Sequence, residues 1–312
     1  MRALRFIGKT LAGLLATLLV LVGGFIGYHH IMLRHEANEL EPAGQMATVG
    51  GHRMSVSAHG PKNDEPAIVF ISGAGTASPI YSFKPLTDRL DDAFRTVVVE
   101  RFGYGYSDEV DTDRHVAAML EDTREALLLA GEVPPYVLAP HSMGGLEALY
   151  WAQTYPDEVA GVVGLDMAVP HSYDLLDLEG EKATMDLGRQ LTFLGLSRLM
   201  GGDDLTAGLG ADQIAQQEML THRNFLGDSQ YAEGLALLDN AATVQAGDLP
   251  DGPMLMFVSD GDEIGDFWVP ASTEFAGQAG AELVQLDVGH YVFQHEPDLI
   301  AQQTAAFIET RL

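Results

Sequence analysis

Short apolar runs alternate with amphipathic segments along most of the chain. Runs of four to six mainly aliphatic residues are typical of strands that are buried on both faces. Such runs lie at Ala67–Ile71, Thr96–Glu100, Tyr136–Ala139, Gly161–Leu165, Met254–Val258 and Glu282–Leu286. Helical spacing of apolar residues follows at Ile80–Leu90, His115–Ala130, Leu146–Thr154 and Pro297–Arg311. Strands that alternate with helices predict an α/β fold with a mostly parallel sheet and helices on both faces.

Two segments depart from this alternation. Met46–Val49 and Arg53–Ala58 flank Gly50-Gly51 and predict a hairpin at the start of the sheet. From about residue 169 to 249 the strand pattern disappears, and a helical pattern interrupted by glycines remains. We therefore expect a helical insertion within one large domain, which a chain of 312 residues is long enough to build.

The N-terminal segment contains an apolar run that is much longer than those of the predicted strands. Leu11 to Tyr28 contains no charged side chain, and these residues would span about 27 Å as a helix. Basic residues precede this run and acidic residues dominate after Glu36, so the positive-inside rule predicts a cytoplasmic N-terminus and an extracytoplasmic body. A cleaved signal peptide is the alternative, although no Ala-x-Ala site follows. We expect an anchor over residues 1–35, a linker over 36–45, and one domain over 46–312.

Composition and charge exclude some classes of function. The first 35 residues carry four basic and no acidic side chains, whereas the remainder carries 13 basic and 45 acidic ones. Such an acidic body repels nucleic acid, so no nucleic-acid role is expected. The chain has no cysteine, which excludes disulfides, cysteine metal sites and a thiol nucleophile.

One turn carries the strongest chemical signal. Pro140-His141-Ser142-Met143-Gly144-Gly145 follows the apolar run Tyr136–Ala139 and precedes the helical segment Leu146–Thr154. Strand, sharp turn with a serine at its tip, and helix form the layout of a nucleophile elbow, which exposes the hydroxyl. The usual pattern G-x-S-x-G has glycine where this chain has Pro140.

A serine hydroxyl needs a histidine that takes its proton and an acid that orients the histidine. In parallel sheets these groups lie beyond the carboxyl ends of strands. His290 lies just beyond the run Glu282–Leu286, and Ser259-Asp260-Gly261-Asp262-Glu263 lies just beyond Met254–Val258. The order serine, acid, histidine is the order associated with a nucleophile elbow.

With these residues in view, the chain resembles the α/β-hydrolase fold serine hydrolases, the lipase- and esterase-like members with a helical cap. The resemblance covers about residues 46–312 and rests on four segments that occur in the family's order. They are Ile71–Gly75, Arg101–Asp108, His141–Gly145, and Gly289-His290 followed by Pro297. The second segment resembles the family's D-x-x-G-x-G-x-S loop, with Glu100 in place of the aspartate.

The resemblance implies a role for each matched residue. It implies that Ser142 is the nucleophile, His290 the general base and Asp262 the triad acid. Asp260 is a rival acid, and Asp166 is a third candidate because some members place the acid after that strand. The resemblance also implies an oxyanion hole formed by two backbone N–H groups, those of Ala74 and Met143. Ser72 stands where the family usually has histidine.

Two further histidines lie near these segments. We interpret His141 as a packing residue beside the serine, and His295 as part of the start of the last helix. The function expected from the resemblance is cleavage of a carboxylic ester without metal or organic cofactor. An amidase, a peptidase, a C–C hydrolase or an inactive binding protein on the same fold remain alternatives, and the oligomeric state is left open.

Overall fold

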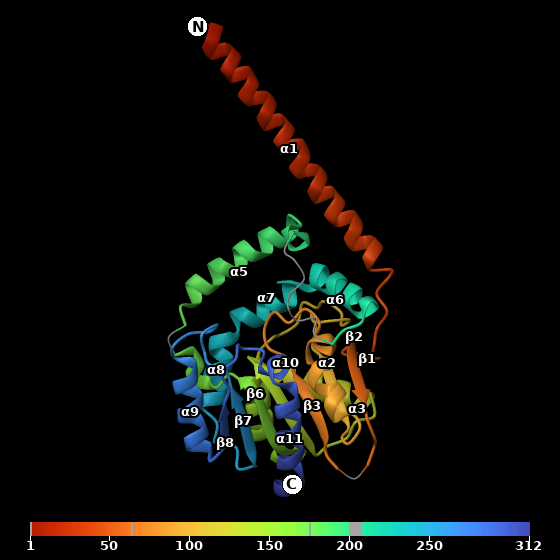
Figure 1. The fold of residues 1–312 in the computed structure, drawn as a ribbon, viewed down its shortest axis with the longest axis vertical. Helices are drawn as coiled ribbons and strands as arrows, with labels where there is room; N and C mark the ends of the chain where they lie inside the picture. Colours follow the sequence, from red (N-terminus) through yellow and green to blue (C-terminus); the bar gives the residue numbers. More distant parts are fainter. Residues whose placement is uncertain (1, 64, 175, 200–207) are drawn as a thin grey trace.

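A single eight-stranded sheet forms the centre of the molecule (Figure 1). The computed structural model describes residues 2–63, 65–174, 176–199 and 208–312. The strands are β1 (Gln45–Val49), β2 (His52–His59), β3 (Ala67–Ile71), β4 (Thr96–Glu100), β5 (Tyr136–Ser142), β6 (Val159–Met167), β7 (Met254–Val258) and β8 (Glu282–Gln285). Their order is β1-β2-β4-β3-β5-β6-β7-β8. Among the strands of the described residues, only the pairs β1–β2 and β2–β4 are antiparallel, so the predicted hairpin and mostly parallel sheet are confirmed.

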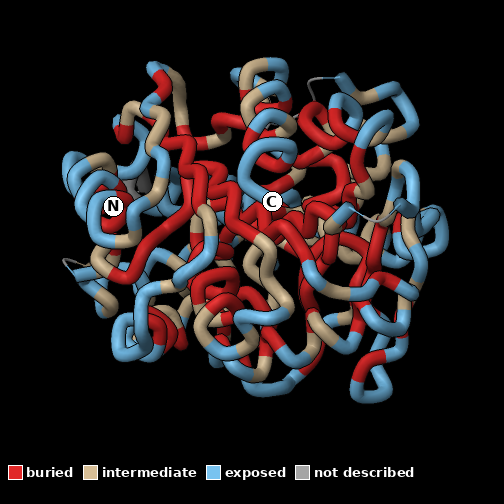
Figure 2. The backbone as a smooth tube through the Cα atoms, turned by 90° about the horizontal axis from the view of Figure 1, so that it is seen from below, coloured by how far each residue is buried: buried red, intermediate tan, exposed pale blue. Residues whose placement is uncertain are grey.

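Helices cover both faces of this sheet because the central strands are apolar on both faces. Ile68 and Phe70 of β3 pack in one cluster with α2 (Pro79–Leu90), α10 (Val292–His295) and α11 (Pro297–Arg311). Val69 and Ile71, which point to the opposite face, pack with α3 (Val116–Leu129) and α4 (Gly144–Thr154). Figure 2 shows the buried chain running through the middle and exposed turns outside it.

The sequence pattern missed some features. Helix α9 (Trp268–Ala279) occupies a segment for which we predicted no element. Strand β5 continues through the serine turn to Ser142, and β6 extends to Met167, beyond the predicted end at Leu165. Both extensions lie at the carboxyl edge of the sheet, where they place Ser142 and Asp166.

The predicted helical insertion lies between β6 and β7, and we call it the cap. Its elements are η2 (Pro170–Tyr173), α5 (Leu178–Phe193), η3 (Leu196–Arg198), α6 (Ala211–Asn224), α7 (Asp228–Leu235) and α8 (Leu237–Gln245). Asn224 of α6 donates hydrogen bonds to the carbonyls of Ala77 and Gly105, in the loops that follow β3 and β4. The cap therefore rests on loops at the carboxyl edge of the sheet.

The N-terminal helix α1 (Arg2–Glu36) extends away from the body on the side of the cap (Figure 1). Within the described residues it is the one helix long and apolar enough to cross a membrane, with a mean hydropathy of 2.2 over its most apolar window. A signal sequence near the N-terminus meets the same criteria of length and composition. Its apolar side chains from Phe6 to Val22 are exposed.

Glu100, the residue that stands in place of the family's aspartate, is fully buried at the end of β4. It accepts hydrogen bonds from the backbone N–H groups of Tyr106 (2.9 Å) and Ile80 (3.4 Å). A Cβ on Gly105 would lie 1.9 Å from its carboxyl carbon, so the longer acid fills space that only glycine leaves open. Loss of water on burial raises the pKa of Glu100 to about 7.

We expect this buried carboxyl to make folding stability depend on pH. The pKa of Glu100 is higher in the folded chain than in the unfolded chain, so the unfolded chain loses this proton at lower pH. The free energy of unfolding therefore falls as pH rises from about 4.5 to about 7. Relative to Glu100→Gln, the wild-type free energy of unfolding should fall by roughly 3 kcal/mol between pH 5 and pH 8. Denaturation of both proteins in detergent at the two pH values measures this difference. An equal pH dependence for both would show that Glu100 is not responsible.

Candidate active site

Ser142 lies on a strained turn between β5 and α4. Its φ of 50° is in the left-handed region, which non-glycine residues adopt at turns that position a functional side chain. Gly144 and Gly145, the second and third residues after the serine, are glycines because the turn is crowded. A Cβ on Gly144 would lie 2.6 Å from the carbonyl oxygen of Ile71, and one on Gly145 would lie 2.2 Å from that of Ala168. The geometry is that of a nucleophile elbow.

Pro140 occupies the position where the elbow pattern has glycine. It is a buried residue of β5 and lies opposite Ile71 of β3. The close backbone approaches that require glycine occur after Ser142, at Gly144 and Gly145. The elbow therefore retains glycine where the packing demands it, and proline is accommodated two residues before the serine.

His290 follows β8, and the acid that contacts it is Asp166, at the end of β6. Nδ1–H of His290 donates to Oδ2 of Asp166 over 2.6 Å. The other carboxylate oxygen of Asp166 accepts from Nε1–H of Trp268 (2.7 Å) and from the backbone N–H of Ser259 (2.9 Å). Asp166 is fully buried and has a φ of 53°. Three donors thus satisfy its carboxylate and fix the orientation of the His290 ring.

The predicted pairing of His290 with Asp262 differs from this geometry. Asp262 is exposed, and its backbone N–H donates to Oδ1 of Asp260. The loop around them supports the site in another way, because Ser259 donates to Asp166 and Glu263 accepts from the backbone N–H of His290 (2.9 Å). The structure therefore corrects the partner of His290 to Asp166, our third candidate.

The roles of Ser259, Glu263 and Trp268 were not found from the sequence. A local signal existed for Asp166 alone, since it is an acid at the end of the long apolar run that begins at Gly161. Trp268 lies 102 residues further along the chain and meets Asp166 only in the folded protein.

His141 packs between the serine turn and His290. Its ring centroid lies 4.5 Å from that of His290, and its Nε2–H donates to the backbone carbonyl of His290 (3.3 Å). Burial holds the pKa of His141 well below its usual range, so the ring is neutral. His141 therefore fills the space beside the pair, as predicted. His295 is exposed and ends α10, and Glu296 separates it from the last helix.

The loop after β3 lies directly against the serine. A Cβ on Gly73 would lie 2.5 Å from Cβ and 3.2 Å from Oγ of Ser142, so only glycine fits there. The carbonyl of Ser72 accepts a hydrogen bond from Arg101 (2.8 Å). This contact fixes the loop that contains Ala74. Met143 precedes the first turn of α4, where backbone N–H groups lack partners within the helix.

Arg101 itself belongs to a buried ion cluster. Its guanidinium contacts Glu233 of α7 (2.7 Å) and lies 3.6 Å from Glu147 of α4, and all three side chains are almost fully buried. A buried charge is stable only when it is paired. The cluster therefore joins three parts of the site: the loop after β3, the elbow helix and the cap.

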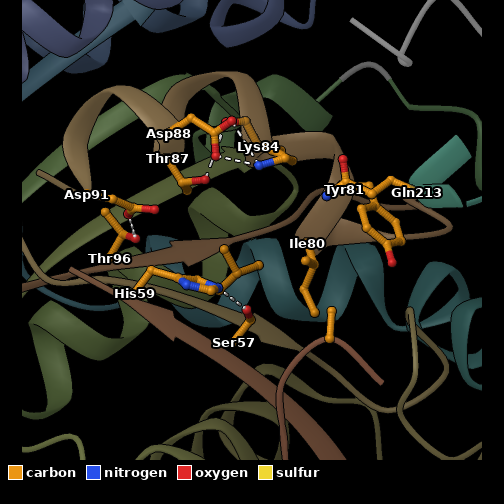
Figure 3. Close-up of a pocket in the computed structure, with 12 residues that line it drawn as sticks. Ser57, His59, Ile80, Tyr81, Lys84, Thr87, Asp88, Asp91, Thr96 and Gln213 are labelled. Carbon is orange, nitrogen blue, oxygen red and sulfur yellow. Dashed lines mark hydrogen bonds and ion pairs between the residues drawn. The ribbon is translucent and has the colours of Figure 1, made fainter. Parts of the chain in front are cut away.

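A separate pocket of about 190 Å³ lies near the antiparallel part of the sheet (Figure 3). Ser57 and His59 hydrogen-bond within it over 3.0 Å. The two carboxylates that line it contact other groups, since Asp88 binds Lys84 and Asp91 binds Thr96. Thr96 begins β4, so this pocket reaches the amino edge of the parallel strands, whereas Ser142, Asp166 and His290 follow carboxyl ends.

A serine on a strained elbow and a buried acid–histidine pair at one sheet edge define the α/β-hydrolase class. The family model described as alpha/beta hydrolase fold matches residues 66–199. The uncharacterized protein YbdG of Bacillus subtilis (strain 168) is 30% identical over 326 residues, which cover 98% of this chain and 97% of that protein. The chain therefore belongs to the alpha/beta hydrolase fold family.

Other relatives share part of the sequence or the fold alone. The 2-(acetamidomethylene)succinate hydrolase of Mesorhizobium japonicum is 30% identical over 132 residues, covering 42% of this chain and 45% of that enzyme. Epoxide hydrolase A from Mycobacterium thermoresistibile superposes with a TM-score of 0.65 over 86% of this chain and 99% of its own, at 18% identity. The family and the hydrolase that is similar in sequence support a hydrolase, whereas the epoxide hydrolase shows the fold alone.

Proposed function

We propose that this protein is a serine hydrolase that cleaves a carboxylic ester through an acyl-serine intermediate. The observation that carries the proposal is the 2.6 Å hydrogen bond from His290 to the buried Asp166, at the sheet edge where Ser142 occupies its strained turn. Nδ1 of His290 is engaged by Asp166, which leaves Nε2 as the nitrogen that can take a proton.

The proposed reaction proceeds in two halves. In the first, Oγ of Ser142 attacks the ester carbonyl carbon while its proton passes to Nε2 of His290. The backbone N–H groups of Ala74 and Met143 stabilise the oxyanion, and His290 returns the proton to the leaving alkoxide. In the second half, water attacks the acyl-serine carbonyl carbon while its proton passes to Nε2 of His290. His290 then gives that proton to Oγ of Ser142 as the bond to the acyl group breaks, which releases the acid and restores the serine. No step needs a metal or an organic cofactor.

The alternatives use the same residues on other bonds. An amide, a peptide or a C–C bond could react at such a triad, and the Mesorhizobium relative is named as a hydrolase of an acetamidomethylene compound. An inactive binding protein is the remaining alternative. Support for an enzyme comes from the buried Asp166, which orients His290, and from Arg101, which holds the loop beside Ser142.

A fluorophosphonate probe tests the chemistry directly, because it labels only an activated serine. We expect covalent labelling of Ser142, found by peptide mapping, and turnover of p-nitrophenyl esters of graded chain length. The matched p-nitroanilides should react far more slowly. Faster turnover of the anilides would favour the amidase, and no labelling together with no turnover would favour the binding protein.

We also propose that α1 is retained as a membrane anchor with the catalytic domain outside the cytoplasm. His29 is 1% exposed and accepts a hydrogen bond from Nε–H of Arg198 in the cap (2.9 Å). A peptide cleaved near residue 30 would remove this buried contact. A mature chain that begins near residue 30 in N-terminal sequencing would contradict the anchor.

A further inference from the structure

The C-terminal end of α1 is packed against the cap. Arg198 of η3 forms two hydrogen bonds of 2.7 Å with the carboxylate of Glu36, and both side chains are nearly buried. A Cβ on Gly195 would lie 2.8 Å from Cβ of His29, so the cap loop approaches α1 closely. The segment after α1 is held as well, because Gln216 of α6 bonds the backbone of Glu39 and Glu41. The direction of α1 is therefore set by the cap.

Apolar side chains of the cap are exposed beside this junction. They are Leu187 (56% exposed), Leu191 (38%), Phe193 (61%) and Leu199 (71%), and we call them the cap's apolar patch. Leu187 and Leu191 lie one turn apart on α5 and share a helix face. Figure 1 shows α5 as the cap helix on the outer side of the body, the side from which α1 extends.

Two members of the patch, Phe193 and Leu199, lie beside the part of α1 that directly follows its uncharged run. The ring of Phe193 is 4.9 Å from that of His30, which follows the uncharged run that ends at Tyr28. Tyrosine is enriched at membrane interfaces, where its ring meets the headgroups. Leu199 directly follows Arg198, the residue that binds Glu36. These two side chains thus lie along the last two turns of α1, directly after its uncharged run.

We propose that the cap's apolar patch lies in the outer boundary of the same bilayer that α1 crosses. This inference rests on the proposed anchor. The body is strongly acidic, so electrostatic attraction to an anionic surface cannot hold the cap there, and burial of apolar side chains supplies the affinity. The cap would then rest on the membrane, and the carboxyl edge of the sheet that the cap covers would face the bilayer.

The absence of cysteine allows a sharp test. Single-cysteine variants Leu191→Cys in the patch, Leu18→Cys in α1 and Leu128→Cys in α3 carry an NBD fluorophore in the full chain, in phosphatidylcholine nanodiscs. All three native side chains are exposed, so the substitutions leave the core intact. Nitroxide-labelled lipids then quench fluorophores within the bilayer, with 5-doxyl lipid probing the boundary and 12-doxyl lipid the interior. Leu128 lies beside Tyr136 at the amino edge of the sheet, away from the cap, and is the matched control.

We expect 5-doxyl lipid to quench Leu191→Cys strongly, 12-doxyl lipid to quench Leu18→Cys strongly, and neither to quench Leu128→Cys. Quenching at Leu18 without quenching at Leu191 would overturn the membrane contact of the cap and leave the anchor intact. Lack of quenching at both positions would overturn the anchor itself. A blue-shifted but unquenched label at Leu191 would indicate that a second copy covers the patch, and would also overturn the inference.

Discussion

Ser142→Ala should abolish ester turnover, with kcat reduced by about 10⁴-fold or more. The variant removes the atom that forms the covalent intermediate, whereas the proposed backbone donors of Ala74 and Met143 remain and give at most slow residual hydrolysis. Steady-state kinetics with a short p-nitrophenyl ester measure the loss. The melting temperature should change little, because Ser142 contributes a single hydroxyl at a partly exposed position.

The matched control for this variant is Ser272→Ala. Ser272 is fully buried in α9, and its hydroxyl lacks a hydrogen-bond partner among the described residues. The same change in chemistry at this position should leave kcat within about twofold of the wild type, since it removes no hydrogen bond among the described residues. Turnover by Ser142→Ala at a rate near the wild type would refute the acyl-serine mechanism.

Asp166→Asn should lower kcat by about 10³- to 10⁴-fold with a much smaller change in KM. The amide has the shape of the carboxylate, but it cannot stabilise the imidazolium that forms when His290 takes the proton of Ser142. Its NH₂ group can also favour the wrong tautomer of His290. The exposed acid of the neighbouring loop supplies the control, because Asp262→Asn should change kcat by no more than about twofold.

This pair of variants distinguishes the observed contact from the one that the sequence predicted. A large loss in Asp262→Asn combined with a small loss in Asp166→Asn would show that the working enzyme uses the loop after β7. Thermal unfolding of each variant separates loss of chemistry from loss of structure. Asp166→Asn should also lower the melting temperature, since Trp268 and Ser259 would then face an altered acceptor.

The sequence predicted the parts of the site that local patterns encode. An apolar strand, a sharp turn and a helix mark the elbow, so Ser142 could be placed from its neighbours alone. His290 follows the last strand run, which brings it to the same edge of a parallel sheet. The acid that contacts His290 could not be chosen in this way, because β6 and β7 are neighbours and acids lie at or beyond the carboxyl ends of both strands.

Burial and long-range contacts decided between those acids. Asp166 is buried because Trp268 and Ser259 donate to it, and its contact with His290 joins residues 124 positions apart. The ion pairs of Arg101 with Glu233 and of Arg198 with Glu36 likewise join residues that are far apart in the sequence. None of these pairs has a periodic signal, because they form only where separate elements meet.

By itself, then, the sequence determined the α/β alternation, the elbow with Ser142, the histidine at the sheet edge and the apolar N-terminal helix. Those features depend on apolar and polar residues that recur every two to four positions, and such spacings can be read from the sequence itself. The tertiary structure alone decided which carboxylate orients His290, and that α1 packs against the cap. Both depend on which surfaces fold together, and that follows from the packing of the whole chain.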